Sequence, residues 1–466
     1  MAREIYNSTI AELGALLRSR ETTPTELTRL YLERLDTVAR RYNAVVTITE
    51  ERALREAVAA EAEMRAGYDR GPLHGIPWGA KDLLAVEGYP TTWGAPPYRD
   101  QTFGSDATVV RRLRDAGAVL VAKLGMVELA GGMGYKQPNA SLTGPGITPW
   151  QADTSPSWSG GSSSGSGSAV AAGAVGFAIG SETWGSIVTP AAFCGITGLR
   201  PTYGRVSRHG AMALSWTLDK LGPMCRSAED CGLVLAAIAG DDPADGTASR
   251  REYAWPPAGV RAKGFRFGVL SDATVGVQPE VRANFEASLS VLEEIGTVEV
   301  VSLPEFPYND VASVIIQGEL AAAFEDLMTS GDVRELTAPE DRINGLAALA
   351  LPAHVYIRAL RIRRLICRAL DELMAGYDAL IAPTLPTVAS PIGEAFDRYF
   401  DRSNRSAIGA AANIAGLPGV AVPNGFGERG LPTSLSFVGR AWGENDVLAA
   451  AHVYQQRTHW HQRHPL

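Results

Sequence analysis

Apolar residues recur at helical spacing near the start of the chain, in the segment TTPTELTRLYLERLDTVARR at positions 22–41. Thr23 is expected to cap a helix, with Pro24 in its first position and Glu26 completing a capping box. The pattern therefore predicts an amphipathic helix that begins at Pro24. The apolar residues on its buried face are Leu27, Leu30, Tyr31, Leu35 and Val38.

Short apolar runs alternate with helical patterns further along the chain. One helical pattern stops at Gly117 and leads into an apolar run at 118–122. An apolar run at 265–270, a helical segment and a second run at 298–303 repeat the same order. No internal repeat is visible. The alternation indicates strands that are separated by helices.

Two further strand patterns lie near the C-terminus. The run ALIAP at 379–383 predicts a buried strand, and VAVPNGF (420–426) and TSLSFVG (433–439) flank a turn as in a β-hairpin. Helices that alternate with buried strands are typical of the α/β class. We therefore predict an α/β fold built on a large mixed, mostly parallel twisted β-sheet, with helices covering both faces.

The composition excludes several classes of function. Hydrophobic residues make up 45% of the 466 residues and charged residues 20%, which is enough apolar material for a large core. The net charge is −8 and no block of Lys and Arg occurs, so we expect no nucleic acid and no membrane partner. The first residues lack the pattern of a signal peptide, and no run of about 20 apolar residues exists. These features favour a cytoplasmic protein.

The four cysteines show no CxxC pairing, and none has a histidine partner at metal-binding spacing. We interpret them as buried thiols of a reducing compartment. Three of the seven histidines lie in the last eight residues, as in a solvated terminus. No metal site is expected.

The stretch WSGGSSSGSGSAV at 158–170 has the composition of a flexible linker. Polar residues usually border such a linker, but here small apolar residues follow directly, at 169–181. A second glycine-rich turn, SETWGSIVTPAAFCG, occupies 181–195. Glycine turns expose backbone N–H groups, which suits an oxyanion hole. The flanking residues favour an active-site turn over a linker.

Lys81 follows a strand-like run in which Ile76, Trp78 and Ala80 share one face. The ordinary interpretation is a solvated lysine that pairs with Asp82. The alternative is a buried lysine with a depressed pKa that acts as a base. Serines are frequent in the glycine turns, and serine–lysine pairs are a variant of serine catalysis. Lys81 is therefore a candidate base.

Three motifs in order together resemble the amidase signature family, and the resemblance extends over almost the whole chain. It implies a single amidase domain at 1–466, with an N-terminal helical part at 1–65, a signature core at 70–240 and the rest of the sheet and the pocket segments at 241–466. The motifs are GIPWGAKD (75–82), SGGSSSGSGSAVAAG (159–173) and GSETWGSIVTPAAFCGITGLRPTYGRVS (180–207).

The family uses a Ser–cis-Ser–Lys triad, which the resemblance places on Ser186, Ser162 and Lys81. Ser186 would be the nucleophile, Ser162 the bridging serine and Lys81 the base. In the family the bridging serine follows a cis peptide bond, which would here join Gly161 to Ser162. Ser163 fits a supporting role by the same analogy.

The resemblance also implies an oxyanion hole and a cofactor-free mechanism. A proton would pass from the nucleophile through the bridging serine to the neutral lysine, and water would release the acyl-enzyme. No metal or organic cofactor is required. The oxyanion hole would use the backbone N–H groups of Thr183, Trp184, Gly185 and Ser186.

The chain departs from the family at Trp184 and Val188, where many members have glycine and a basic residue. Trp184 is expected to bind substrate by forming a wall of the pocket, and core packing is the alternative. The segments 125–155 and 305–360 are expected to shape the rest of the pocket. They do not reveal the substrate.

The resemblance leaves three functions open. The first is a free-standing amidase that hydrolyses a small amide, ester or carbamate, with an aryl group as one option. The second is the A subunit of a tRNA-dependent amidotransferase, a glutamine amidase in a complex. Those subunits usually carry an Asn-, Arg- and Asp-Gly-containing stretch where this chain has GELAAAFEDLMTSGD (318–332), which favours the first function. The third is a non-catalytic binding protein, and a homodimer stays open.

Overall fold

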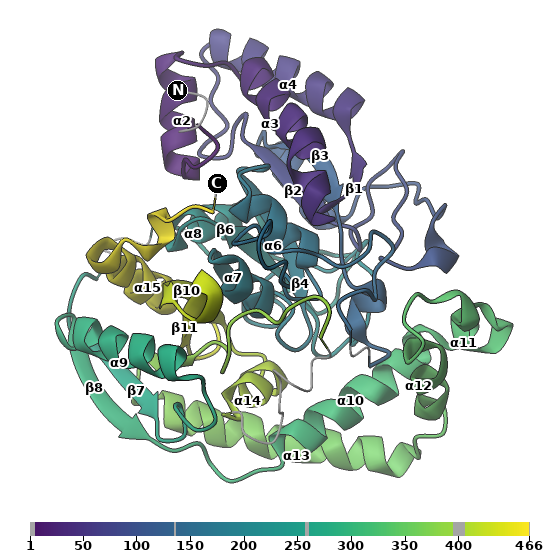
Figure 1. Cartoon of the computed structure of the whole chain (residues 1–466), viewed down its shortest axis with the longest axis vertical. Coiled ribbons are helices and arrows are strands. Elements are labelled where there is room, and N and C mark those ends of the chain that lie inside the picture. The colour runs from purple at the N-terminus through teal and green to yellow at the C-terminus, as the bar shows by residue number, and fades with distance from the viewer. Residues whose placement is uncertain (1–4, 135–136, 257–260, 395–405, 466) are drawn as a thin grey trace.

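The computed structural model describes residues 5–134, 137–256, 261–394 and 406–465 (Figure 1). Eleven strands form one sheet across this part of the chain. The strands are β1 Val45–Ile48, β2 Pro77–Lys81, β3 Val119–Leu124, β4 Phe177–Glu182, β5 Thr197–Arg200, β6 Lys220–Cys225, β7 Phe265–Leu270, β8 Gly296–Val301, β9 Ala379–Pro383, β10 Gly419–Phe426 and β11 Pro432–Val438. Their order in the sheet is β1-β3-β2-β4-β6-β5-β10-β11-β9-β7-β8.

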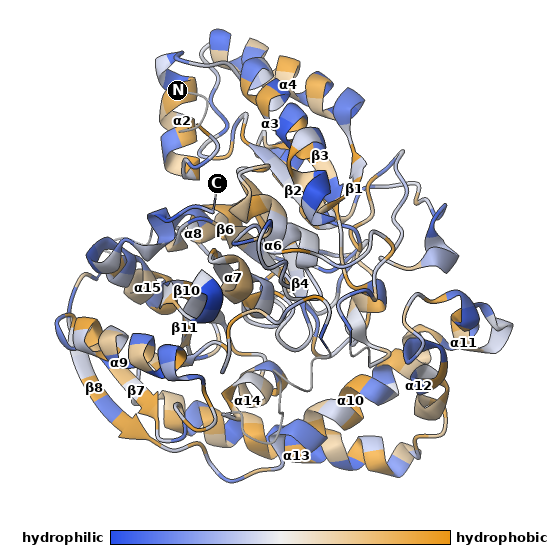
Figure 2. Cartoon of the chain, in the orientation of Figure 1, coloured by the Kyte–Doolittle hydropathy of each residue, from blue (hydrophilic) through white to orange (hydrophobic). Residues whose placement is uncertain are grey.

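Helices surround this sheet, and the peripheral ones carry both hydrophilic and hydrophobic residues (Figure 2). The helices are α2 Ile10–Ser19, α3 Pro24–Thr37, α4 Glu50–Arg65, α5 Thr108–Asp115, α6 Ser164–Ala171, α7 Val188–Cys194, α8 Ala228–Ile238, α9 Pro279–Glu293, α10 Tyr308–Ala323, α11 Glu325–Ser330, α12 Asp341–Ala348, α13 Ala353–Met374, α14 Ile408–Ile414 and α15 Glu444–Thr458.

The sheet is mixed, as predicted, but the prediction that it is mostly parallel is wrong. Among the described strands, four neighbouring pairs are parallel and six are antiparallel. The parallel pairs lie toward the two ends of the sheet, and the middle strands from β4 to β9 are antiparallel. A helix between two strands permits a parallel crossover, but it does not decide which strands become neighbours.

Helices cover both faces of the sheet, which confirms that part of the prediction. Successive side chains of β4 point to opposite faces. Phe177 and Ile179 join an apolar cluster with residues of α8 and α15. Ala178, between them, joins a second cluster with residues of α6 and α7. The sheet therefore separates two apolar cores.

The local predictions hold at several elements. The hydroxyl of Thr23 accepts the Glu26 N–H at 3.2 Å, and α3 begins at Pro24. Gly117, with φ of +79°, follows α5 and leads into β3. The strands β10 and β11 pair as the expected hairpin. The stretch 158–170 is no linker, because it enters α6 and the residues 169–181 after it are all buried.

Possible membrane spans were searched for among the described residues. No single helix there is long and apolar enough to cross a membrane. One bent pair, α12 and α13 at 87°, passes that test together, by length and composition only.

Candidate active site

Lys81 ends β2, a strand whose five residues are all buried. Its Nζ donates to Ser162 Oγ at 2.7 Å and to Ser181 Oγ at 2.8 Å. The ordinary pairing with Asp82 is not formed, because Asp82 pairs with the equally buried Lys123 at 2.7 Å. Lys81 is therefore a buried amine that faces two serine hydroxyls.

Burial lowers the pKa of Lys81 to about 7, although the negative charges of Asp219 and Glu182 act to raise it. A lysine at its ordinary pKa is almost fully protonated at neutral pH and cannot accept a proton. At a pKa of about 7, a large fraction of Lys81 is neutral under the same conditions. Lys81 is therefore compatible with the role of base that the sequence implied, and that role stays a prediction.

The serines of the first glycine turn lie against this lysine. The peptide bond between Gly161 and Ser162 is cis, as the resemblance implied. Ser163 links the first glycine turn to Ser181 and Ser186. Its N–H donates to the Ser186 carbonyl at 3.2 Å, and its hydroxyl donates to the Ser181 carbonyl and accepts the Ser181 N–H. This contact pattern supports the supporting role expected for Ser163.

Ser186 lies in the turn between β4 and α7, and 8% of its surface is exposed. The described hydrogen bonds include none between its Oγ and that of Ser162, so the expected relay requires that contact to form. Gly185 has φ of +90°, a conformation that favours glycine. Ser186 is therefore a nearly buried serine on a glycine turn.

The backbone of this turn has unused donors. Among the hydrogen bonds of the described residues, none uses the N–H groups of Thr183, Trp184, Gly185 or Ser186. Backbone N–H groups are usually satisfied, and those left open on a turn can receive an oxyanion. The arrangement fits the oxyanion hole that the resemblance implied.

A buried carboxylate fixes the segment directly after the nucleophile. Glu182 Oε2 accepts the N–H groups of Ile187 at 2.9 Å and Val188 at 3.1 Å. Its Oε1 accepts from Arg200 at 2.8 Å and from Asn413 at 3.0 Å. Burial alone would raise the pKa of Glu182, but the charge of Arg200 and these hydrogen bonds hold it at about 2. The start of α7 is thus tied to the sheet.

Three residues of the site were missed by the sequence analysis: Ser181, Glu182 and Asp219. Asp219 accepts from the Thr183 hydroxyl at 2.5 Å and from two backbone N–H groups of its own loop. Lys81 and Ser181 are 100 positions apart. No local pattern signals such a contact, although Ser181 and Glu182 lie inside a motif that the resemblance used.

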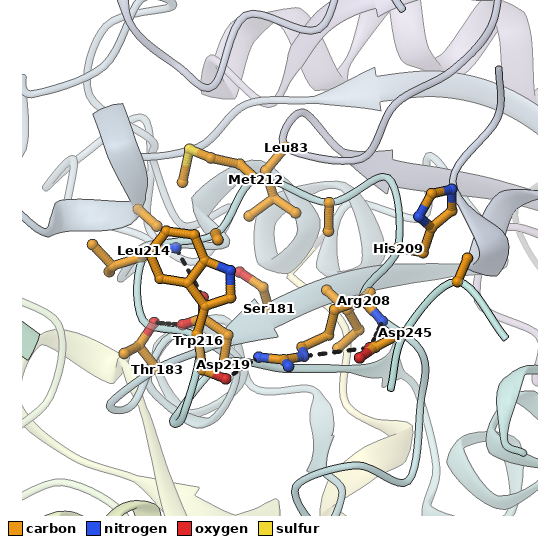
Figure 3. A pocket seen from close by; sticks show the side chains of 15 residues that line it. Leu83, Ser181, Thr183, Arg208, His209, Met212, Leu214, Trp216, Asp219 and Asp245 are labelled. Atoms are coloured by element: carbon orange, nitrogen blue, oxygen red, sulfur yellow. Dashed lines mark hydrogen bonds and ion pairs between the residues drawn. The ribbon is translucent and has the colours of Figure 1, made fainter. Parts of the chain in front are cut away.

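A pocket opens beside these turns (Figure 3). It encloses about 670 Å³ of empty space, part of it open to solvent, and it reaches the site at Ser181 and Thr183. Leu83, Met212 and Leu214 give it an apolar wall.

The aromatic residue in this pocket is Trp216, and Trp184 is not among the residues that line it. Trp184 is half-buried and lies near Gly409 of α14. Its expected substrate contact stays a prediction. Of the two expected pocket segments, 125–155 contributes Ala130, and residues 135–136 lie outside the described residues.

The expectation of no metal is compatible with the side chains that the structure describes. Within that part of the chain, no group of three or more His, Cys, Asp or Glu side chains is placed to hold a metal ion.

A buried lysine bonded to a serine, close to a second serine on a turn with open N–H groups, fits the arrangement of a serine–lysine acyl-transfer site. The Amidase family model matches residues 26–448, so the chain belongs to the Amidase family. It is an amidase-signature hydrolase, as the motifs indicated.

Individual relatives match the chain over nearly its full length. The A subunit of glutamyl-tRNA(Gln) amidotransferase from Moorella thermoacetica is 38% identical, and 99% of each chain is covered. A chain of a solved structure, described as a vestigial protein complex that reveals the evolutionary origins of an s-triazine catabolic enzyme, is 30% identical with a TM-score of 0.87, covering 97% of this chain and 98% of that one. The peptide amidase of Stenotrophomonas maltophilia is 32% identical with a TM-score of 0.83, and 97% of each chain is covered.

These relatives correct the expectation about partners. The sequence analysis expected a small-molecule substrate, with no nucleic acid involved. The amidotransferase subunits, at 35–38% identity over 99% of this chain, are by name parts of an assembly that acts on glutamyl-tRNA(Gln). The expectation failed because it rested on net charge, and one chain of an assembly needs no basic surface of its own if another chain binds the nucleic acid.

Proposed function

We propose that this chain is the amide-hydrolysing subunit of an amidotransferase-type assembly, with glutamine as the carboxamide that it cleaves. Two sets of relatives support the assembly, because the amidotransferase relatives are named as subunits and the solved structure is described as a vestigial protein complex. The observation that carries the chemistry is the 2.7 Å contact between Lys81 and Ser162 in a buried site.

The proposed reaction begins when Ser162 passes a proton to neutral Lys81 and takes one from Ser186. The Ser186 oxygen attacks the carboxamide carbon, and N–H groups of the 183–186 turn bind the oxyanion. The proton returns through Ser162 to the leaving nitrogen, which departs as ammonia. Water activated by the same relay then hydrolyses the acyl-enzyme and frees Ser186.

The test is Ser186→Ala with glutamine as substrate and released ammonia as the measurement. We expect the rate to fall at least about 10³-fold, because the members of such a relay act as a unit. Ser164→Ala is the matched control: this serine begins α6, two positions after Ser162, and among the described hydrogen bonds its hydroxyl donates to the Gly125 carbonyl, at 3.4 Å. Equal ammonia release by Ser186→Ala and wild type would remove Ser186 from the mechanism.

A free-standing amidase for other carboxamides is the second candidate. It is favoured by the peptide amidase similarity and by the segment 318–332, which departs from the usual amidotransferase stretch. Turnover of a carboxamide by the purified chain alone would support this function. Turnover that appears only in an assembly larger than the single chain would support the first. The cytoplasmic location expected from the sequence stays a prediction in both cases.

A further inference from the structure

The pocket beside the catalytic turns has an indole in its wall. Trp216 lies near Leu214, Thr183 and Asp219 in the close view of the pocket (Figure 3). Its surface is 47% exposed, although most large apolar side chains of the sheet are buried. An indole half open to solvent at a pocket has apolar area that a bound group would cover.

A buried carboxylate holds the loop that carries this indole. Glu319 of α10 is 5% exposed and accepts from the Thr217 N–H at 3.0 Å, the Thr217 hydroxyl at 2.7 Å and the Ser215 hydroxyl. It also accepts from the Tyr356 hydroxyl of α13 at 2.9 Å. Both residues that flank Trp216 are thus fixed to one buried group.

The backbone of Trp216 is anchored separately from its side chain. Its carbonyl accepts from the Tyr203 hydroxyl at 2.8 Å and from Arg208, and Arg363 donates to the next carbonyl, that of Thr217, at 2.8 Å. Removing the indole leaves all of these bonds in place. The loop at 215–217 is therefore held in place by several hydrogen bonds that do not involve the Trp216 indole.

The charged groups at the far end of the pocket are already paired with the protein. Arg208 donates to Thr247 at 2.7 Å as well as to the Trp216 carbonyl, and it lies 3.6 Å from Asp245. Its guanidinium is largely committed to these partners. On the side of Thr183, the pocket offers a ligand the apolar side chains of Leu83, Met212 and Leu214 and the Trp216 indole, next to the polar Ser181.

We propose that Trp216 selects substrates for the Ser186 site, and that the site hydrolyses, besides glutamine, primary carboxamides whose acyl chain ends in a flat apolar group. The proposal rests on the proposed acyl transfer at Ser186 and goes beyond glutamine. Ammonia is a small leaving group, so the acyl part of a primary carboxamide is the part that needs the space of the pocket. Glu319 acts as a positioning residue, because it touches the loop and not the substrate.

The test compares two fluorophosphonates, one with a 2-phenylethyl group and one with an ethyl group, as probes of Ser186 in the full chain. In each reaction the Ser186 Oγ–P bond forms, the P–F bond breaks, fluoride leaves, and the hydroxyl proton passes to the relay. We expect the phenylethyl probe to react at least about tenfold faster with wild type. Trp216→Ala should lower this ratio about tenfold, and Trp216→Phe should retain most of it.

Two further variants separate the role of the indole from general damage. Glu319→Gln should lower the ratio of phenylethyl to ethyl labelling rates, while the ethyl probe still labels Ser186. Tyr68→Ala should leave this ratio unchanged, because Tyr68 is 60% exposed and does not line the pocket. A wild-type ratio near one, or an equal ratio in wild type and Trp216→Ala, would overturn the proposal. Failure of both probes to label Ser186 in wild type would instead overturn the proposed function.

Discussion

The proposed acid–base chemistry depends on Lys81, and the burial of this lysine makes that chemistry dependent on pH. A base works only when it is neutral, and the pKa of Lys81 is lowered to about 7. The rate of Ser186 labelling by a fluorophosphonate should therefore rise with pH through about 7 and level off above 8. At pH 6 it should be about one tenth of the plateau. A flat profile from pH 5.5 to 8 would exclude Lys81 as the base.

A second buried lysine makes a control necessary. Burial, together with the charge of Arg200, lowers the pKa of Lys220 to about 7 as well. Lys220 donates to Asn413 at 2.8 Å and not to a catalytic serine. Lys220→Met should therefore keep the midpoint of the profile near 7, even if the plateau falls. Lys81→Met should lose the labelling at every pH.

At the same scale, the sequence predicts the residues that carry motifs and misses those that act only through distant contacts. Lys81, Ser162 and Ser186 were predicted because their motifs resemble a family. Ser181 and Trp216 were missed because a hydroxyl 100 positions from its lysine, and an indole on a loop that Glu319 holds, have no local signature. For the same reason, the sequence analysis predicted Trp184, and not Trp216, as the aromatic wall of the pocket.

At the scale of elements, the turn before α7 depends on Glu182. In Glu182→Gln the side chain keeps only one acceptor oxygen, and the other oxygen becomes an NH₂ donor. That NH₂ group then faces other donors, either the backbone N–H groups of Ile187 and Val188 or the side chains of Arg200 and Asn413. We expect the unfolding free energy to fall by about 2–4 kcal/mol, and Ser186 labelling to slow at least about tenfold.

Urea unfolding and the labelling rate measure these two effects of Glu182→Gln. The matched control is Glu51→Gln, at an exposed side chain whose ion pair with Arg55 is solvated. It should change neither quantity appreciably. If Glu182→Gln labels as fast as wild type, the carboxylate stabilises the fold without ordering the nucleophile turn.

Individual elements were predicted better than their arrangement. The capped start of α3 and the strands around 118–122, 265–270 and 379–383 follow from residue types within a few positions of each other. The direction of the middle strands depends on which strands pair, and these pairings join segments such as β5 and β10, over 200 positions apart. Period and propensity carry no information about such pairings.

At the scale of the whole molecule, buried long-range contacts join the two halves of the chain. Glu444, at the start of α15, is fully buried. Its carboxylate forms an ion pair with Arg205 at 2.9 Å and accepts the Thr202 N–H at 3.0 Å. Residues 205 and 444 are 239 positions apart, and β5 pairs with β10 next to them. If the chain is a single domain, as we predict, these contacts should make it unfold in one transition.

Glu444→Ala tests this coupling, because it leaves the buried Arg205 without its carboxylate. We expect a loss of about 3–5 kcal/mol in unfolding free energy, measured in urea by circular dichroism. Asp371→Ala, which breaks an exposed pair with Arg440, should cost at most about 1 kcal/mol. In wild type and both variants, loss of helix signal and loss of Ser186 labelling should share one midpoint. Separate midpoints would divide the chain into two units, and the triad would then unfold without the C-terminal half.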